Sequence, residues 1–165
     1  MTHRKSWVLA LTWLAGAGLA QAQNATDGSD EPLAGKHWQL QTSLYTRHFS
    51  PDPRHNNRQE LLALERHRTD GVLGGGATFR NSFGQRSIYL YIGRQFPVQD
   101  LPVHFKLTGG MLHGYRGEYW DKIPLNRFRV APAIVPSVGF SQGPFVGELV
   151  LVGAAATMVT AGVRF

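Results

Sequence analysis

The chain has 165 residues and no cysteine, and it combines 17% charged with 42% hydrophobic residues. This length supports one domain, and the lack of cysteine excludes disulfide frameworks and zinc–thiolate sites. The formal charge is +6, but lysine and arginine are scattered singly and form no basic run, so we predict no binding to nucleic acid.

The first segment has the features of a secretory signal peptide. Two basic residues precede an apolar stretch at 7–20, and a small-x-small pattern of the kind a signal peptidase cleaves ends at Ala22. The apolar stretch is shorter than the ~20 residues that a membrane helix needs. We therefore predict a signal peptide over residues 1–22, a disordered polar lead-in over 23–36 and a folded domain over 37–165.

The folded domain shows a hydrophobic period of two residues and contains no apolar run long enough for a membrane helix. This period indicates β-strands rather than helices. We predict eight strands, at residues 38–49, 60–69, 72–80, 87–96, 103–117, 130–141, 145–152 and 157–165.

The connections between these strands alternate between two kinds. Every second connection is a turn sequence rich in Gly, Pro or Asp, at 70–71, 97–102 and 142–144. The others are mostly longer and richer in charge, at 50–59, 81–86 and 118–129. Short turns at one end and long loops at the other are typical of outer-membrane barrels. We therefore predict an all-β fold, an eight-stranded antiparallel transmembrane β-barrel in the outer membrane of a Gram-negative bacterium.

The last predicted strand favours this membrane barrel over a soluble lipocalin-like barrel of the same length. Val159, Ala161, Val163 and Phe165 alternate with small or polar residues, and the chain ends on the phenylalanine. A terminal strand of this kind resembles the signal by which outer-membrane barrels are recognised, which implies the barrel assembly machinery as a partner. The closing strand of a soluble barrel is the alternative interpretation.

The predicted interior is partly apolar. In the strand at 145–152 neither face is polar, because leucine alternates with valine. An eight-stranded barrel has room inside for side chains or one small ligand, so such an interior can hold a hydrocarbon chain. Glycines at 74–76 and 109–110 are the candidates for leaving that space, with bulges and bends as the alternative role.

Two prolines interrupt the sixth predicted strand. Pro132 and Pro136 each lack a backbone N–H and cannot donate to a neighbouring strand. Missing donors weaken the contact between adjacent strands, which predicts a lateral opening in the wall. Bulges that only shape the barrel are the alternative.

The longer loops gather polar and basic residues at one rim. If the amino terminus starts in the periplasm, this rim faces outward. Its basic residues are Arg47, Arg54, Arg58, Arg80, Arg86, Lys122, Arg127 and Arg129. Arginine binds phosphate bidentately, and lipid A presents phosphates in the outer leaflet. A generally solvated basic surface is the alternative.

At this rim the sequence resembles the PagP family of lipid A palmitoyltransferases. Residues 79–83, Phe-Arg-Asn-Ser-Phe, are similar to the family's Phe-Lys-Asp-Ser-Trp, with the glycines 74–76 upstream. Residues 120–125, Trp-Asp-Lys-Ile-Pro-Leu, are similar to Trp-Asn-Tyr-Ile-Pro-Leu, and His48 lies two strands before the first motif. The resemblance covers most of the domain. It implies an eight-stranded barrel that moves a palmitoyl chain from a phospholipid to lipid A, with an interior pocket that measures the acyl chain.

The resemblance also implies three catalytic residues. His48 matches the family's histidine and Ser82 its serine, while Asn81 stands where the family has aspartate. An amide can orient an ester or polarise a carbonyl, but it does not accept a proton as a carboxylate does. His48 shares its strand column with Trp38, which points it outward unless a bulge or the loop re-aims it.

Transfer to a hydroxyl needs the same residue types on chemical grounds. Histidine suits the general base, and Ser82 and Asn81 suit stabilisation of the oxyanion. Ser82 as covalent nucleophile stays open, although no G-x-S-x-G elbow surrounds it. His55 is the reserve candidate for the base. The histidines show no metal-ligand spacing, and we predict no cofactor.

Two other functions remain open. A non-enzymatic outer-membrane barrel that binds at the cell surface is one, although its loops are short. A lipid A deacylase is the other, and it would need a compact His, Ser and acid site on the membrane-facing wall.

Overall fold

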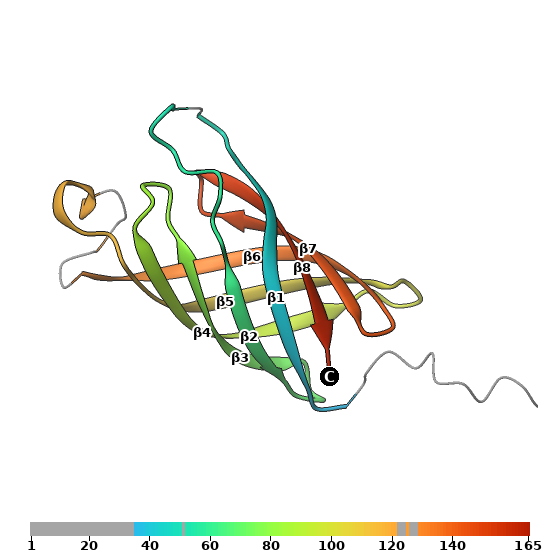
Figure 1. The fold of residues 1–165 in the computed structure, drawn as a ribbon. Helices are drawn as coiled ribbons and strands as arrows, with labels where there is room; N and C mark the ends of the chain where they lie inside the picture. Colours follow the sequence, from blue (N-terminus) through green and yellow to red (C-terminus); the bar gives the residue numbers. More distant parts are fainter. Residues whose placement is uncertain (1–34, 51, 122–124, 126–128) are drawn as a thin grey trace, which may run out of the picture. The chain divides into compact units, whose positions relative to one another are not determined.

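The computed structural model describes residues 35–50, 52–121, 125 and 129–165. These residues form a closed barrel of antiparallel strands that follow one another in chain order from β1 to β8 (Figure 1). The last strand pairs with the first and so closes the wall. The all-β barrel predicted from the two-residue period is confirmed. The predicted signal peptide and all but the end of the predicted lead-in lie outside the described residues.

Each predicted strand overlaps an observed one. The strands are β1 (His37–His48), β2 (Leu62–His67), β3 (Val72–Arg80), β4 (Arg86–Pro97), β5 (Val103–His113), β6 (Val130–Gln142), β7 (Phe145–Val152) and β8 (Ala156–Arg164). A single 3-10 turn, η1 (Gly117–Tyr119), follows β5 among the described residues. The largest difference is the end of β5, which we predicted at residue 117. The strand ends earlier because Gly114 takes a positive φ of 139°, which extended strands do not use.

The barrel has two different ends. We call the end with the turns at 68–71, 98–102 and 143–144 the turn end, and the end with the connections at 49–61, 81–85, 114–129 and 153–155 the loop end. No helix among the described residues is long and apolar enough to cross a membrane.

Side chains alternate across the wall, with the large apolar ones on the outside. In β4, Tyr89 and Tyr91 face inward and are buried, whereas Ile88, Leu90 and Ile92 are 47%, 62% and 75% exposed. The other strands follow the same pattern, and buried polar residues lie on their inner faces. A soluble lipocalin-like barrel would present a polar outer face to water, whereas the outer face of this barrel is covered by large apolar side chains.

A β-bulge in β1 reverses the facing of its second half. The β1–β8 register shifts between Ser43 and Tyr45, so Leu44 is an extra residue with no partner of its own. Odd-numbered residues face inward before the bulge, and even-numbered residues face inward after it. His48 is therefore buried at 6% exposure, although the uninterrupted alternation of the sequence would point it outward.

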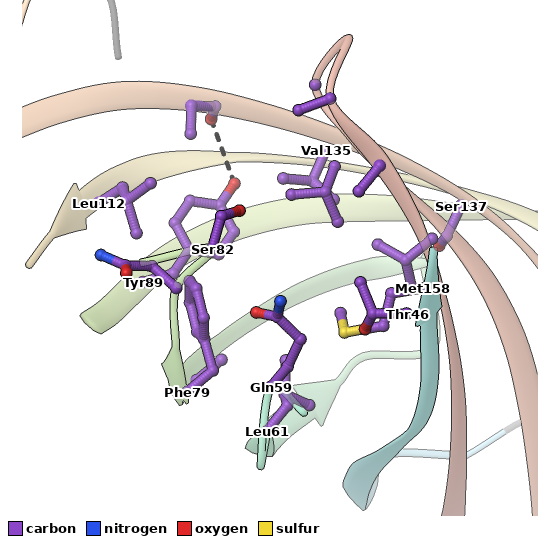
Figure 2. Close-up of a pocket in the computed structure, with 18 of the residues that line it drawn as sticks. Thr46, Gln59, Leu61, Phe79, Ser82, Tyr89, Leu112, Val135, Ser137 and Met158 are labelled. Carbon is purple, nitrogen blue, oxygen red and sulfur yellow. Dashed lines mark hydrogen bonds between the residues drawn. The ribbon is translucent and has the colours of Figure 1, made fainter. Parts of the chain in front are cut away.

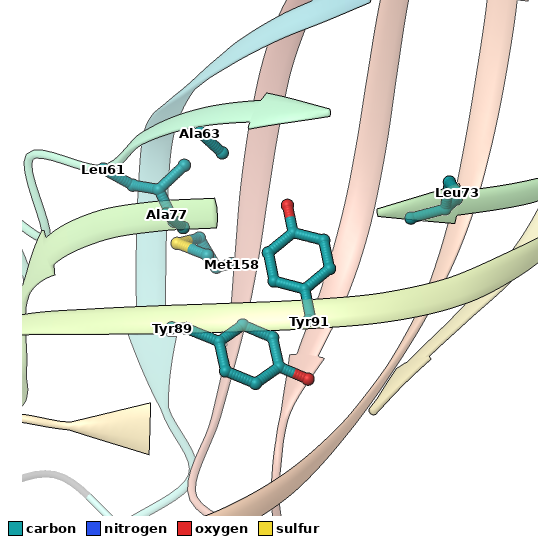
Figure 3. Close-up of a cluster of buried hydrophobic side chains, with 7 residues drawn as sticks. All are labelled: Leu61, Ala63, Leu73, Ala77, Tyr89, Tyr91 and Met158. Carbon is teal, nitrogen blue, oxygen red and sulfur yellow. The ribbon is translucent and has the colours of Figure 1, made fainter. Parts of the chain in front are cut away.

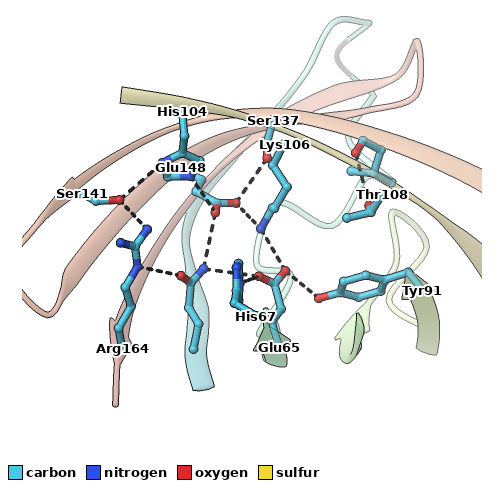
Figure 4. A network of polar contacts seen from close by, with 12 residues as sticks. Glu65, His67, Tyr91, His104, Lys106, Thr108, Ser137, Ser141, Glu148 and Arg164 are labelled. Atoms are coloured by element: carbon cyan, nitrogen blue, oxygen red, sulfur yellow. Dashed lines mark hydrogen bonds and ion pairs between the residues drawn. The ribbon is translucent and has the colours of Figure 1, made fainter. Parts of the chain in front are cut away.

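The interior near the turn end is filled by a polar network (Figure 4). Lys106 Nζ lies 2.9 Å from Glu65 Oε1 and 2.7 Å from Glu148 Oε2, and all three side chains are buried. His67 Nε2 lies 2.8 Å from Glu65 Oε2, and the Tyr91 hydroxyl donates to Glu65 Oε1 at 2.9 Å. Buried charges persist when they are paired and hydrogen-bonded, so this network forms a closed polar floor.

Above the floor the interior becomes apolar (Figure 3). A cluster of buried side chains comes from β2, β3, β4 and β8 and from the residue before β2. Its members toward the loop end are Leu61, Ala63, Ala77, Tyr89 and Met158. Tyr91 belongs to the floor itself, and Leu73, which pairs with His67 and Gly93, lies at the turn end. The barrel interior thus changes from charged at the turn end to apolar toward the loop end.

Candidate functional site

His48, Ser82 and Asn57 form a hydrogen-bonded chain at the loop end. His48 is the last residue of β1, Ser82 lies in the turn between β3 and β4, and Asn57 lies in the β1–β2 loop. His48 Nε2 is 2.8 Å from Ser82 Oγ, and His48 Nδ1 is 2.8 Å from Asn57 Oδ1. The structure therefore brings together two of the three predicted site residues, His48 and Ser82, and adds Asn57.

The partner of Nδ1 fixes the tautomer of this histidine. An amide oxygen only accepts hydrogen bonds, so Nδ1 must carry the proton that Asn57 Oδ1 accepts. In the neutral ring, Nε2 then has a free lone pair, and the Ser82 hydroxyl donates to it. His48 is thus arranged to take a proton from Ser82.

Tyr115, which follows β5, also reaches the serine. Its hydroxyl is hydrogen-bonded to Ser82. Burial raises the pKa of Tyr115 above its usual value, and this effect outweighs the opposing influence of Ser82. The phenol therefore keeps its proton at neutral pH and remains a donor.

The β1–β2 loop is held against the turn that carries Ser82. The backbone N–H of Asn56 donates to the carbonyl of Ser82 at 2.7 Å. The ring of His55 lies 4.5 Å from the ring of His48 and 5.9 Å from that of Phe83, measured between centroids. His55, the reserve candidate, therefore packs against the histidine that contacts Ser82 and supports its position.

The predicted site residue Asn81 makes contacts of a different kind. It is 1% exposed, and its Oδ1 accepts from the backbone N–H groups of Phe83 and Gln85, both at 3.0 Å. Its Nδ2 donates to Ser87 Oγ at 3.2 Å. All these partners belong to the turn or to the start of β4. Asn81 thus fixes the turn on which Ser82 sits, and its side chain makes no hydrogen bond to His48 or Ser82 among the described residues.

We predict that the two substitutions of this asparagine have different effects. Asn81→Asp keeps both acceptor contacts to the turn and loses only the donor to Ser87, so the acyl transfer that the resemblance implies should stay within about tenfold of wild type, or ~1.4 kcal/mol in barrier. Asn81→Ala removes all three contacts and should lose most of the activity. The assay is palmitate transfer from a phospholipid to lipid A in detergent micelles. Full activity in Asn81→Ala would show that the turn is held without this side chain.

A cavity of about 760 Å³ lies inside the barrel beneath this site (Figure 2). Ser82, His48 and Tyr115 line its mouth, and Glu65 and Lys106 of the polar floor line its base. Most of the wall between them is apolar, with Leu61, Ala63, Ala77, Phe79, Leu112, Val135, Val150 and Met158. The volume is within the ~300–1,000 Å³ usual for ligand pockets. The predicted interior space for an apolar chain is present.

The glycines predicted to leave this space do not line the cavity. A Cβ on Gly75 would lie 3.1 Å from both Glu65 Cγ and Tyr91 Cζ, so those side chains already fill the space over the glycine. Gly110 is likewise covered by Tyr91 of the neighbouring strand. That prediction is wrong. The inward-facing glycines make room for neighbouring side chains, and the space in the cavity comes instead from small and medium apolar residues at the loop end.

The wall beside β6 lacks strand pairing along part of its length. The pairing of β6 with β7 runs only between Ser137 and Gln142, so the part of β6 that holds both prolines, residues 130–136, has no β7 partner. β5 pairs with β6 along this whole stretch. Ile134 faces outward at 70% exposure and still lines the cavity, as does Pro132. The stretch where a lateral opening was predicted therefore lacks a strand partner on its β7 side, and the opening itself stays a prediction.

The basic rim is partly paired with acids. Arg54 contacts Asp52 at 2.8 Å and Arg80 contacts Glu60 at 2.7 Å. Arg54 holds the pKa of the Asp52 carboxyl well below its usual range through hydrogen bonds. Lys122 and Arg127 of the predicted rim lie outside the described residues, as does the middle of the 120–125 motif.

Sequence reasoning missed the roles of Asn57 and Tyr115. Both follow strands and lie in polar loops, but no spacing distinguishes them from their neighbours. Within the described residues, no group of three or more His, Asp or Glu side chains is arranged to hold a metal ion. No protein-family model matches the chain, and no curated protein matches it significantly.

Proposed function

We propose that this protein is an outer-membrane acyltransferase that moves a palmitoyl chain from a phospholipid to lipid A. The observation that carries the proposal is the hydrogen-bonded pair His48–Ser82 at the mouth of an apolar cavity. A reactive hydroxyl and its base thus lie directly above a space that suits a hydrocarbon chain.

The distribution of polarity supports a location in the outer membrane. Large apolar side chains cover the outer face of the wall, among them Leu90, Ile92, Phe105 and Ile134, and charged residues fill the interior near the turn end. Membrane barrels need this arrangement because lipid contacts the outer face of the wall.

The gap beside β6 supports a membrane lipid as the donor. A phospholipid acyl chain in the bilayer can pass between β6 and the β7–β8 hairpin without leaving an apolar environment, because Ile134 and Pro132 form the edge of that path. Its ester then reaches Ser82 while its tail lies in the cavity. The polar floor limits how deep the tail can reach, so the cavity selects for acyl length.

The arrangement also bears on the two other functions. The residues of a deacylase for lipid A would face the membrane on the outer wall, whereas His48 faces the barrel interior. A barrel that only binds at the surface has no need for a buried histidine held by two hydrogen bonds. Acyl transfer accounts for both the site and the cavity.

Mass spectrometry of lipid A tests the proposal. We expect lipid A from Gram-negative cells that express this chain to gain one palmitoyl group relative to cells without it, and cells that express His48→Ala to show no gain. The wild-type protein should also be found in the outer-membrane fraction as a heat-modifiable barrel. Loss of one acyl chain would identify a deacylase, and unchanged lipid A with correctly folded protein would leave a non-enzymatic barrel.

A further inference from the structure

We propose that Ser82 is a covalent nucleophile that carries the acyl chain as an ester on its Oγ. Asn57 is the positioning residue that orients His48 to act as the base for Ser82. The inference rests on the proposed acyl transfer and concerns its chemical course. Direct attack of the acceptor hydroxyl on the donor ester is the competing course, in which His48 activates the acceptor and Ser82 only donates a hydrogen bond.

The geometry favours the covalent course because the two ring nitrogens of His48 have separate partners. Asn57 Oδ1 holds one nitrogen and Ser82 Oγ holds the other, each at 2.8 Å. A nucleophile, a base and a residue that orients the base are the components of a catalytic triad. An amide in the third position is sufficient to fix the tautomer, as in cysteine proteases of the Cys-His-Asn type.

Asn57, not Asn81, occupies this third position. The polar atoms of Asn81 are all engaged by the turn and by Ser87. The Asn57 side chain comes from the opposite side, on the β1–β2 loop, and reaches His48. The amide that matches the aspartate of the resembling family is thus structural, and a residue from another loop orients the base.

The first half-reaction transfers the acyl group to the protein. The Ser82 hydroxyl proton moves to His48 Nε2 as Oγ forms a bond to the carbonyl carbon of the donor ester. The bond from that carbon to the glycerol oxygen then breaks, and the glycerol oxygen takes the proton from Nε2. A lysophospholipid leaves, and the chain stays in the cavity as an acyl ester of Ser82.

The second half-reaction restores the enzyme. The acceptor hydroxyl gives its proton to Nε2, and its oxygen attacks the carbonyl carbon of the acyl ester. Ser82 Oγ leaves and takes the proton back, so protons balance and nothing is oxidised or reduced. The Tyr115 hydroxyl, which is hydrogen-bonded to Ser82 in the resting state, is the nearby protonated group that would donate to the carbonyl oxygen as negative charge develops on it.

Two measurements on the purified full-length barrel in detergent micelles detect the nucleophile. The first is acid quenching during turnover of p-nitrophenyl palmitate, followed by mass spectrometry of the peptide that contains residue 82. The second is labelling by a fluorophosphonate probe, which reports an activated serine even when the acyl ester does not accumulate. We expect a palmitoyl adduct or a burst of p-nitrophenol together with labelling at Ser82, and none of these in Ser82→Ala.

The role of Asn57 is tested by the pH dependence of labelling. Asn57→Ala should lower the labelling rate about tenfold or more, because nothing then holds the reactive tautomer. Asn57→Asp should restore most of the rate and move the rising limb of the profile to higher pH, since a carboxylate stabilises the protonated imidazole. Asn56→Ala, which disturbs the same loop without touching His48, should leave the position of that limb unchanged.

The outcomes separate this inference from the proposed function. One outcome is a wild-type protein that transfers palmitate to lipid A and yet shows neither labelling at Ser82 nor a burst of p-nitrophenol. That result would overturn the covalent course and would still support the proposed transferase. Labelling at Ser82 without any transfer to lipid A would support the nucleophile and overturn the transferase. If the rising limb of the labelling rate against pH does not shift in a folded Asn57→Asp variant, the positioning role of Asn57 is contradicted.

Discussion

Replacing either His48 or Ser82 with alanine should abolish acyl transfer and leave the barrel folded. His48→Ala removes the ring nitrogen that lies 2.8 Å from Ser82 Oγ and would accept its proton. Loss of a general base typically costs ~10²–10⁴-fold in rate, and loss of an oxyanion donor costs about as much. Both residues lie at the loop end and neither joins the polar floor, so the fold has little dependence on them.

The measurement is palmitate transfer to lipid A in micelles, with heat-modifiable migration on gels as the check of folding. His55→Ala is the matched control, because this ring packs against His48 without a hydrogen bond to Ser82. We expect it to reduce transfer far less than His48→Ala does. If His48→Ala keeps full activity and His55→Ala loses it, His55 is the base and the hydrogen-bonded chain described above is not the site.

Replacing Lys106 with methionine should destabilise the barrel strongly. Lys106 Nζ lies between the carboxylates of Glu65 and Glu148, within 2.9 Å and 2.7 Å, and both are buried at 2% and 3% exposure. Methionine fills a similar volume but removes the lysine cation that lies between the two carboxylates. Removing one partner of a buried ion pair typically costs about 3–5 kcal/mol. Urea unfolding in micelles, followed by tryptophan fluorescence, measures the loss.

A compensated variant tests the cause of this loss. Lys106→Met combined with Glu65→Gln and Glu148→Gln removes all three charges, and it should recover most of the stability that Lys106→Met alone loses. Unfolding of Lys106→Met at the wild-type urea concentration would contradict the role of the lysine. A triple variant as unstable as the single one would show that packing of the lysine stem, not its charge, holds the floor.

The polar floor also connects the fold to the proposed specificity. Glu65, Lys106 and Glu148 line the base of the cavity, and an apolar chain cannot extend among paired charges without breaking them. The depth of the cavity is therefore set by the position of the network along β2, β5 and β7. The contacts that stabilise the barrel therefore also limit the space available to an acyl chain.

The architecture of this protein follows from local signals in its sequence. Alternation of apolar and polar residues with a period of two predicts where each strand lies, because successive side chains of a strand point to opposite faces of the sheet. Turn residues such as Asp70 and Gly71 place the short connections for an equally local reason. The sequence also places His48 and Ser82 at the same rim, where the structure shows them hydrogen-bonded, and their catalytic roles stay predictions.

The tertiary structure alone decided how these residues meet. The bulge at Leu44, which turns His48 inward, depends on the register between the first and last strands, so no local pattern shows it. Asn57 and Tyr115 reach the site from different loops, and only the folded β1–β2 loop and the curvature of the barrel bring them together. Lys106 meets Glu65 and Glu148 across the interior for the same reason. Contacts between side chains far apart in sequence depend on strand register and barrel closure, which hydrophobic periodicity does not encode.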